Sequence, residues 1–189
     1  MATETEIKLQ LPDPDRLRTR LGAPAAARRG YVLEVNRILD TAERRLLDSG
    51  CGLRLREARS LEGPPEQRAE LTFKGPRVAG PVKIREELEV VVSDAATLRA
   101  LFERLGFHEV LVYEKRRESW QYGACVVTID ELPLLGFFAE IEAPSAAAIM
   151  PVRAELQLEA CPLVAETYVE LAATHGQIDS AGRRRLLFG

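Results

Sequence analysis

The sequence predicts an α+β protein in which an antiparallel, eight-stranded sheet closes into a barrel and the helices pack outside it. The expected strands alternate apolar with charged residues, as in Leu53-Arg54-Leu55-Arg56, so each strand has one apolar and one charged face. The expected helices carry single apolar stripes and need an apolar surface to rest on. In a sandwich the apolar faces would cover one another and leave the helices little to cover. A barrel with a charged bore uses every face.

Eight segments share this strand design. The first ten residues alternate Glu4, Glu6 and Lys8 with uncharged residues, which places all three charges on one face of a strand. The other seven expected strands span residues 31–39, 53–56, 70–74, 83–89, 109–118, 124–130 and 137–142. The Ala/Arg-rich stretch 23–30 has no periodicity and is expected to be a loop.

Helices are expected after the first strand and in the second half of the chain. Asp13 is placed to cap a short helix, because an aspartate side chain accepts hydrogen bonds from first-turn amides. A second helix follows Asp94, repeats apolar residues at three- and four-residue spacing, and ends at Gly106. Two further helical stretches follow, one broken at Pro151 and the last over residues 163–174.

Composition indicates one globular domain spanning residues 1–189. The chain is 46% apolar and 29% charged, and its net charge of −3 gives no overall basic field of the kind that nucleic acid attracts. Three widely spaced cysteines suggest neither a disulfide framework nor a zinc site. The charged first strand does not resemble a signal peptide, and no stretch approaches the ~20 apolar residues of a membrane span. We therefore expect a cytoplasmic protein that binds no membrane.

Lysine is rare in this chain and has a biased distribution. Among 26 basic residues the lysines are only Lys8, Lys74, Lys83 and Lys115. All four fall in expected strands on the charged face, and none decorates an expected helix or loop. Because an ammonium group titrates more readily than a guanidinium group, this placement hints at chemistry.

The charged strands carry a set of motifs in a fixed order. The set opens with Glu4-Thr5-Glu6-Ile7-Lys8, an ExExK pattern. It continues with Glu34-Val-Asn36-Arg-Ile-Leu-Asp40-Thr41, Leu53-Arg54-Leu55-Arg56, Leu71-Thr72-Phe73-Lys74-Gly75, Arg85-Glu86-Glu87-Leu88-Glu89, Lys115-Arg116-Arg117 and the stretch from Thr128 to Glu142. From residue 4 to about residue 170, this ordered set resembles the CYTH superfamily, the triphosphate tunnel metalloenzymes. The resemblance implies an antiparallel tunnel with a charged bore, which is the architecture that the strand faces predict.

The resemblance also implies that the bore binds a triphosphate together with Mg²⁺ or Mn²⁺. Arginine forks and lysine point charges suit phosphate oxygens, and carboxylates suit hard divalent cations. The expected substrate-binding residues are Lys8, Arg54, Arg56, Lys74, Arg85, Lys115 and Arg117. The expected metal-side residues are Glu4, Glu6, Asp130, Glu140 and Glu142. The expected catalytic residues are Lys8, Lys74 and Glu87.

One position departs from the pattern of the family. Many relatives have aromatic residues just before the Asp-Thr step, where this chain has Ile38 and Leu39 before Asp40. A tyrosine at that position therefore cannot help a lysine to activate water here. This departure favours activation of water by a metal ion.

Three functions remain open. The first is metal-dependent hydrolysis of inorganic tripolyphosphate, thiamine triphosphate or a nucleoside triphosphate. The second is a class IV adenylyl cyclase, in which the ribose 3′-hydroxyl of ATP attacks and pyrophosphate leaves. The third is a polyphosphate or nucleotide sensor that binds without turnover, although binding an anion alone would not call for so many carboxylates. In each case the partner is a small-molecule triphosphate, with no nucleic acid polymer, and the chain is expected to be a monomer or a homodimer.

Overall fold

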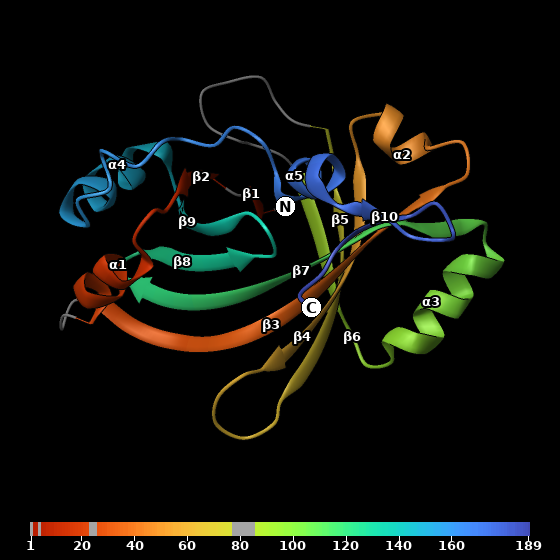
Figure 1. Cartoon of the computed structure of the whole chain (residues 1–189), viewed down its shortest axis with the longest axis horizontal. Coiled ribbons are helices and arrows are strands. Elements are labelled where there is room, and N and C mark those ends of the chain that lie inside the picture. The colour runs from red at the N-terminus through yellow and green to blue at the C-terminus, as the bar shows by residue number, and fades with distance from the viewer. Residues whose placement is uncertain (1, 4, 23–25, 77–85) are drawn as a thin grey trace.

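The computed structural model describes residues 2–3, 5–22, 26–76 and 86–189 (Figure 1). Its strands are β1 (Ala2–Thr3), β2 (Thr5–Gln10), β3 (Ala26–Thr41), β4 (Gly52–Ser60), β5 (Gln67–Lys74), β6 (Glu86–Val92), β7 (Phe107–Tyr122), β8 (Cys125–Leu132), β9 (Gly136–Ala143), β10 (Gln177–Ile178) and β11 (Arg184–Leu186). Its helices are α1 (Pro14–Leu21), α2 (Arg45–Asp48), α3 (Ala95–Arg104), α4 (Ala146–Glu155) and α5 (Tyr168–His175). Within these ranges, no helix is long and apolar enough to cross a membrane.

The N-terminal segment joins the two edges of the sheet. The order across the sheet is β1-β6-β5-β4-β3-β7-β8-β9-β2, and neighbours on this path are antiparallel. β1 pairs with β6 and β2 pairs with β9, yet a single residue separates Thr3 from Thr5, so their Cα atoms are at most about 7.6 Å apart. With β1 and β2 taken as one strand, the described path has eight strands. The predicted antiparallel fold with few helices is confirmed.

The two longest strands, β3 and β7, form the centre of the sheet. Each has 16 residues, and they run side by side along a strongly curved path (Figure 1). The later part of β7, from Arg116 to Tyr122, pairs with β8. Its earlier part, from Leu111 to Tyr113, pairs in parallel with β11. The C-terminal β10–β11 hairpin is therefore fastened to the central strand.

The apolar core lies between the outer face of the sheet and the helices. Leu17 of α1 and Ile149 of α4 are buried in one cluster with Ile141 of β9. Phe102 of α3 packs against a second cluster, which contains Leu55 of β4. The apolar side chains of the strands thus point outward to the helices, as the alternating pattern predicts.

The helix termini follow the sequence signals. The Asp13 side chain accepts from the backbone N–H of Arg16 at 3.1 Å, and the Asp94 side chain accepts from that of Thr97 at 2.9 Å. Gly106, just after α3, has φ of +86°, which a residue without Cβ adopts with little strain. Both predicted helix starts are therefore confirmed.

Two predictions about local structure are wrong. Residues 26–30 are not a loop but the first part of β3, because the end of β7 provides a pairing partner from Ser119 to Tyr122. Pro151 does not break the fourth helix but lies inside α4. Ile149 and Val152, both buried on either side of it, hold the helix on the core although proline cannot donate a backbone hydrogen bond.

The last helix is shorter than predicted, beginning at Tyr168 rather than at residue 163. The preceding segment is hydrogen-bonded to β2 instead: Gln10 N donates to Pro162 O, and Val164 N donates to Lys8 O, both at 2.9 Å. This pairing places the start of α5 beside the N-terminal strand.

Candidate active site

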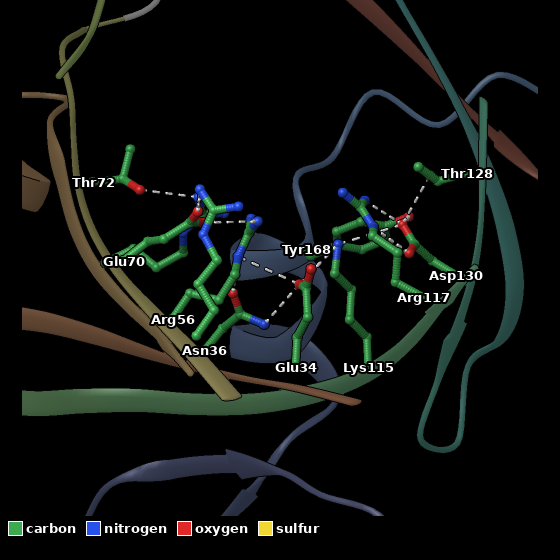
Figure 2. A network of polar contacts seen from close by, with 12 residues as sticks. Glu34, Asn36, Arg56, Glu70, Thr72, Lys115, Arg117, Thr128, Asp130 and Tyr168 are labelled. Carbon is green, nitrogen blue, oxygen red and sulfur yellow. Dashed lines mark hydrogen bonds and ion pairs between the residues drawn. The ribbon is translucent and has the colours of Figure 1, made fainter. Parts of the chain in front are cut away.

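The charged faces of the strands enclose a cavity of about 1600 Å³. The predicted site residues that line it are Glu6, Lys8, Arg54, Arg56, Lys74, Glu87, Lys115, Arg117, Glu140 and Glu142. Asp130 does not line the cavity but is fully buried in contact with Arg117, which does (Figure 2). Glu4 and Arg85 lie outside the described residues, as does Lys83. The structure therefore brings together the described residues that were predicted from separate motifs.

Arg117 holds two carboxylates at once. Its Nε and Nη2 atoms donate to the two oxygens of Asp130, each at 2.6 Å, in the bidentate geometry that suits a guanidinium fork. Nη2 also donates to Glu140, whose Oε1 lies 3.4 Å from Lys8 Nζ. Burial would raise the pKa of Glu140, but the charges of Arg117 and Lys8 outweigh burial and lower this pKa. Glu140 is therefore an anion held between two cations.

Glu34 is a second buried carboxylate that links cations from neighbouring strands. Its Oε2 atom lies 3.4 Å from Lys115 Nζ and 3.5 Å from Arg56 Nε, and Asn36 Nδ2 donates to it at 3.4 Å (Figure 2). Burial would raise the pKa of Glu34, but Arg56 and Lys115 together lower it well below its ordinary value. Glu34 therefore provides a fixed negative charge in the wall of the cavity.

Lys115 is almost completely buried, with 2% of its side chain exposed. Burial and the positive charge of Arg117 lower the pKa of Lys115 to about 8. Its ammonium group lies 3.5 Å from Asp130 Oδ2 as well as close to Glu34. A pKa near neutrality allows Lys115 to exchange a proton in addition to pairing with an anion.

Arg54 differs from the other predicted cations. Within the described ranges, no carboxylate forms an ion pair with it, and its Nη2 donates to Thr72 Oγ1 at 3.1 Å. Its Nε atom is buried and has no hydrogen-bond partner in the described structure. Burial and the nearby Arg56 lower the pKa of Arg54. A buried donor without an acceptor is costly unless a ligand satisfies it, so Arg54 is a candidate for binding an anion.

Lys74 and Glu87, two predicted catalytic residues, are direct neighbours across β5 and β6. Their side chains form an ion pair at the cavity wall. They lie on the part of the sheet that β1 closes, since Ala2 is the β1 partner of Glu87.

The predicted metal residues Glu6 and Glu142 are direct register partners on β2 and β9, and both line the cavity. Lys8 and Glu140 are the next such pair on the same two strands. Side chains of directly opposed residues have Cβ atoms about 5 Å apart, so two carboxylates there can share an ion. Among the described residues, no group of three or more histidine, cysteine or acidic side chains is arranged to hold a metal. The oxygen donors nevertheless fit Mg²⁺ or Mn²⁺, which commonly complete their coordination with phosphate and water.

Among the residues that contact the predicted site, Glu34 and Tyr168 were given no role by sequence reasoning. Glu34 lies in the second motif of the ordered set. It shares a strand face with Asn36, and this spacing could have indicated that Glu34 faces the site. Tyr168 begins α5, and its hydroxyl donates to Asp130 Oδ2 at 2.7 Å. Burial and the charge of Asp130 raise the pKa of Tyr168 well above its ordinary value, which keeps the hydroxyl protonated. No local pattern predicts that a residue at a helix start enters the bore.

The fold and the cavity define the class of this protein. Its antiparallel sheet closes around a cavity that is lined by charged side chains. The chain belongs to the CYTH domain family, whose model matches residues 2–151. It is 39% identical over 72 residues to a putative adenylate cyclase of Methanocaldococcus jannaschii. This aligned stretch spans 38% of the present chain and about two fifths (41%) of that curated relative.

Solved structures with the same fold cover nearly the whole chain. The PH1819 protein of Pyrococcus horikoshii OT3 is 25% identical with a TM-score of 0.77, over 90% of this chain and 98% of that one. A putative adenylate cyclase of Vibrio parahaemolyticus is 20% identical with a TM-score of 0.74, over 90% and 97%. A Hippeastrum protein, described as a putative adenylyl cyclase with a dominant triphosphatase activity, is 15% identical with a TM-score of 0.68, over 92% and 96%.

The buried carboxylate of Glu34 gives a prediction about stability in acid. Its pKa is ordinarily 4.5 and is lower in the folded protein, so its stabilising effect is full above about pH 4.5 and is lost as the pH falls toward the folded-state value. Glu34→Gln should lower the free energy of unfolding at pH 7 by about 3 kcal/mol, because Lys115 and Arg56 lose a buried partner. The difference from wild type should shrink between pH 4.5 and pH 3 in thermal unfolding.

The matched control is Glu57→Gln on β4, whose partner Arg37 also lies outside the cavity lining. This half-exposed pair should contribute less than about 1 kcal/mol. Equal destabilisation by the two variants, or a constant Glu34→Gln difference down to pH 3, would contradict the role of Glu34 as a buried counter-charge.

Proposed function

We propose that this protein is a metal-dependent hydrolase of a triphosphate-containing substrate that binds in the charged cavity. The observation that carries the proposal is Arg54, which lines the cavity, has a buried Nε atom without a hydrogen-bond partner, and forms no ion pair with a carboxylate among the described residues. The surrounding cations come from different strands, with Lys8 on β2, Arg54 on β4 and Lys115 on β7. Such convergence suits an elongated anion with several charges. Membership of the CYTH family supports the proposal.

In this proposal the substrate phosphates replace carboxylates as partners of the cations. Arg54 and Arg56 bind phosphate oxygens from the β4 side, and Lys115 and Arg117 bind them from the β7 side. The carboxylates of Glu34 and Asp130 keep the side chains of Arg56, Lys115 and Arg117 extended and oriented before the substrate arrives. Preorganised donors of this kind stabilise the charge of the transition state without rearranging during the reaction.

Glu6, Glu140 and Glu142, together with Glu4, are the proposed residues that would hold Mg²⁺ or Mn²⁺. A divalent cation bound there would neutralise phosphate charge and lower the pKa of water. The chain's own cations hold the phosphate chain so that water attacks the terminal phosphorus in line. A P–O bond to water forms, the bridging P–O bond breaks, and orthophosphate separates from the remaining diphosphate group. Lys8, Lys74 and Glu87 are the proposed residues for proton transfer.

A class IV adenylyl cyclase is the second candidate, favoured by the names of the Methanocaldococcus and Vibrio relatives. The same cavity would hold ATP, and the ribose 3′-hydroxyl would attack the α-phosphorus with loss of pyrophosphate. The dominant triphosphatase activity ascribed to the Hippeastrum protein, itself described as a putative adenylyl cyclase, supports the hydrolase as the first candidate. The two candidates differ in the nucleophile and share the phosphate-binding residues.

Purified protein should release orthophosphate from tripolyphosphate, thiamine triphosphate or ATP in the presence of Mg²⁺ or Mn²⁺, without cyclic AMP. Chromatography that separates orthophosphate, pyrophosphate and cyclic AMP provides the measurement. Cyclic AMP with an equal amount of pyrophosphate would instead establish the cyclase. Binding of all three compounds without turnover would favour a sensor.

Arg54→Gln should raise KM for the preferred triphosphate about 10- to 100-fold, because a charge-assisted hydrogen bond to an anion contributes about 1.5–3 kcal/mol. The control is Arg59→Gln, an exposed arginine on the same strand that does not line the cavity. Steady-state kinetics should leave the control unchanged. An unchanged KM in Arg54→Gln would remove the main support for the proposed anion site.

Glu142→Gln should abolish metal-dependent turnover and leave the melting temperature nearly unchanged, because the side chain is exposed within the cavity lining. Glu131→Gln is the control, since its partner Arg116 also does not line the cavity. Activity assays with a titration of Mg²⁺ and Mn²⁺ test the assignment. Full activity of Glu142→Gln at low metal concentration would rule out this carboxylate as a metal ligand.

A further inference from the structure

Tyr168 reaches the site from a part of the chain that the family model does not match, since that match ends at residue 151. It is the first residue of α5, and only 6% of it is exposed. A capping box between Thr167 and Glu170 fixes the start of the helix. Ala172 and Leu186 are buried in the same apolar cluster as Tyr168. The tyrosine is therefore held from behind by α5 and β11.

The ring of Tyr168 faces the ammonium group of Lys8, with 3.7 Å between Nζ and the ring centroid. The same ammonium donates to Glu166 O at 3.1 Å and lies 3.4 Å from Glu140 Oε1. The segment leading into α5 also binds the backbone of Lys8, through Val164 N. Lys8 is thus fixed largely by residues 164–168. An aromatic face stabilises a cation without adding a negative charge, so it holds the lysine and leaves its charge available to an anion.

The hydroxyl of Tyr168 contacts a second part of the site. It donates to Asp130 Oδ2 at 2.7 Å, and Asp130 in turn receives the fork of Arg117. Lys115 Nζ lies 4.8 Å from the same ring (Figure 2). One side chain therefore touches residues of β2, β7 and β8 that approach the cavity from different directions.

We infer that Tyr168 is a positioning residue for polyphosphate binding: its ring holds Lys8 and its hydroxyl holds Asp130, and through Asp130 the fork of Arg117. This inference rests on the proposed function and extends it to a residue outside the matched domain. α5 is then part of the anion site. The ligand class is an inorganic or organic polyphosphate whose oxygens meet Lys8 and Arg117 together.

The decisive test is a double-mutant cycle on tripolyphosphate binding, measured by calorimetry with EDTA present so that metal plays no part. Tyr168→Leu and Lys8→Met should each raise the dissociation constant about tenfold, as loss of a desolvated cation–π contact predicts. The double variant should bind only about threefold more weakly than Lys8→Met alone, because the ring acts through Lys8 and only the hydroxyl, which contacts Asp130, acts independently of it. Tyr122→Phe is the control, since it also removes a hydroxyl that donates to a carboxylate, that of Glu155 outside the cavity.

The inference would be overturned if the increases in dissociation constant caused by Tyr168→Leu and Lys8→Met multiplied in the double variant. If Tyr168→Leu does not fold, Tyr168→Phe decides, because it keeps the ring and removes only the hydroxyl. It should raise the dissociation constant about threefold, and this increase should vanish in an Asp130→Asn background. No effect of Tyr168→Phe would then overturn the inference. A wild-type protein that binds no tripolyphosphate, either with EDTA or with Mg²⁺, would remove the proposed function and this inference together. Wild-type binding and hydrolysis with multiplying effects would remove this inference alone.

Discussion

The pairing of buried opposite charges is the constraint on which the rest of this structure depends. A lone charge in the interior of the sheet would cost several kcal/mol, and removing one partner of a pair leaves the other uncompensated. Glu34 meets this requirement for Arg56 and Lys115, and Asp130 meets it for Arg117. These carboxylates keep the cations folded into the bore while leaving them accessible from the cavity. A ligand with several negative charges can then bind to cations that are already in position.

The charged interior determines where the apolar core lies. Because strands alternate side chains between two faces, filling the bore with charges sends the apolar residues to the outside of the sheet. There, α1 and α4 cover the face of β2, β8 and β9, and α3 covers that of β4. The helices thus provide the apolar burial that the sheet interior of an ordinary barrel provides. The site and the core are separated by the thickness of a single sheet.

Period-two alternation made the sheet and most of its wall predictable from sequence. The position of each motif residue in the local alternation predicts which face of the strand it occupies. For Arg54 and Arg56, no knowledge of a distant pairing partner is needed. The predictions that failed concern segments whose structure depends on partners far along the chain. Residues 26–30 form a strand because β7 extends beside them, and Pro151 remains helical because its buried neighbours pack on the sheet. Tyr168 enters the site because residues 162–164 bond to β2, a contact that no local pattern encodes.

The closure of the sheet by its N-terminal segment has a consequence for how the chain folds. The early strand β2 pairs with residues 138–143, which are synthesised much later than β2. Hairpins such as β4–β5 and β8–β9 can form from neighbouring sequence, but this pairing has to close a loop of most of the chain. The edge of β2 therefore stays open for longer than any hairpin strand during synthesis. The alternating charges of residues 4–8 protect the strand while it is unpaired, because charged residues on an open strand edge discourage association with other chains.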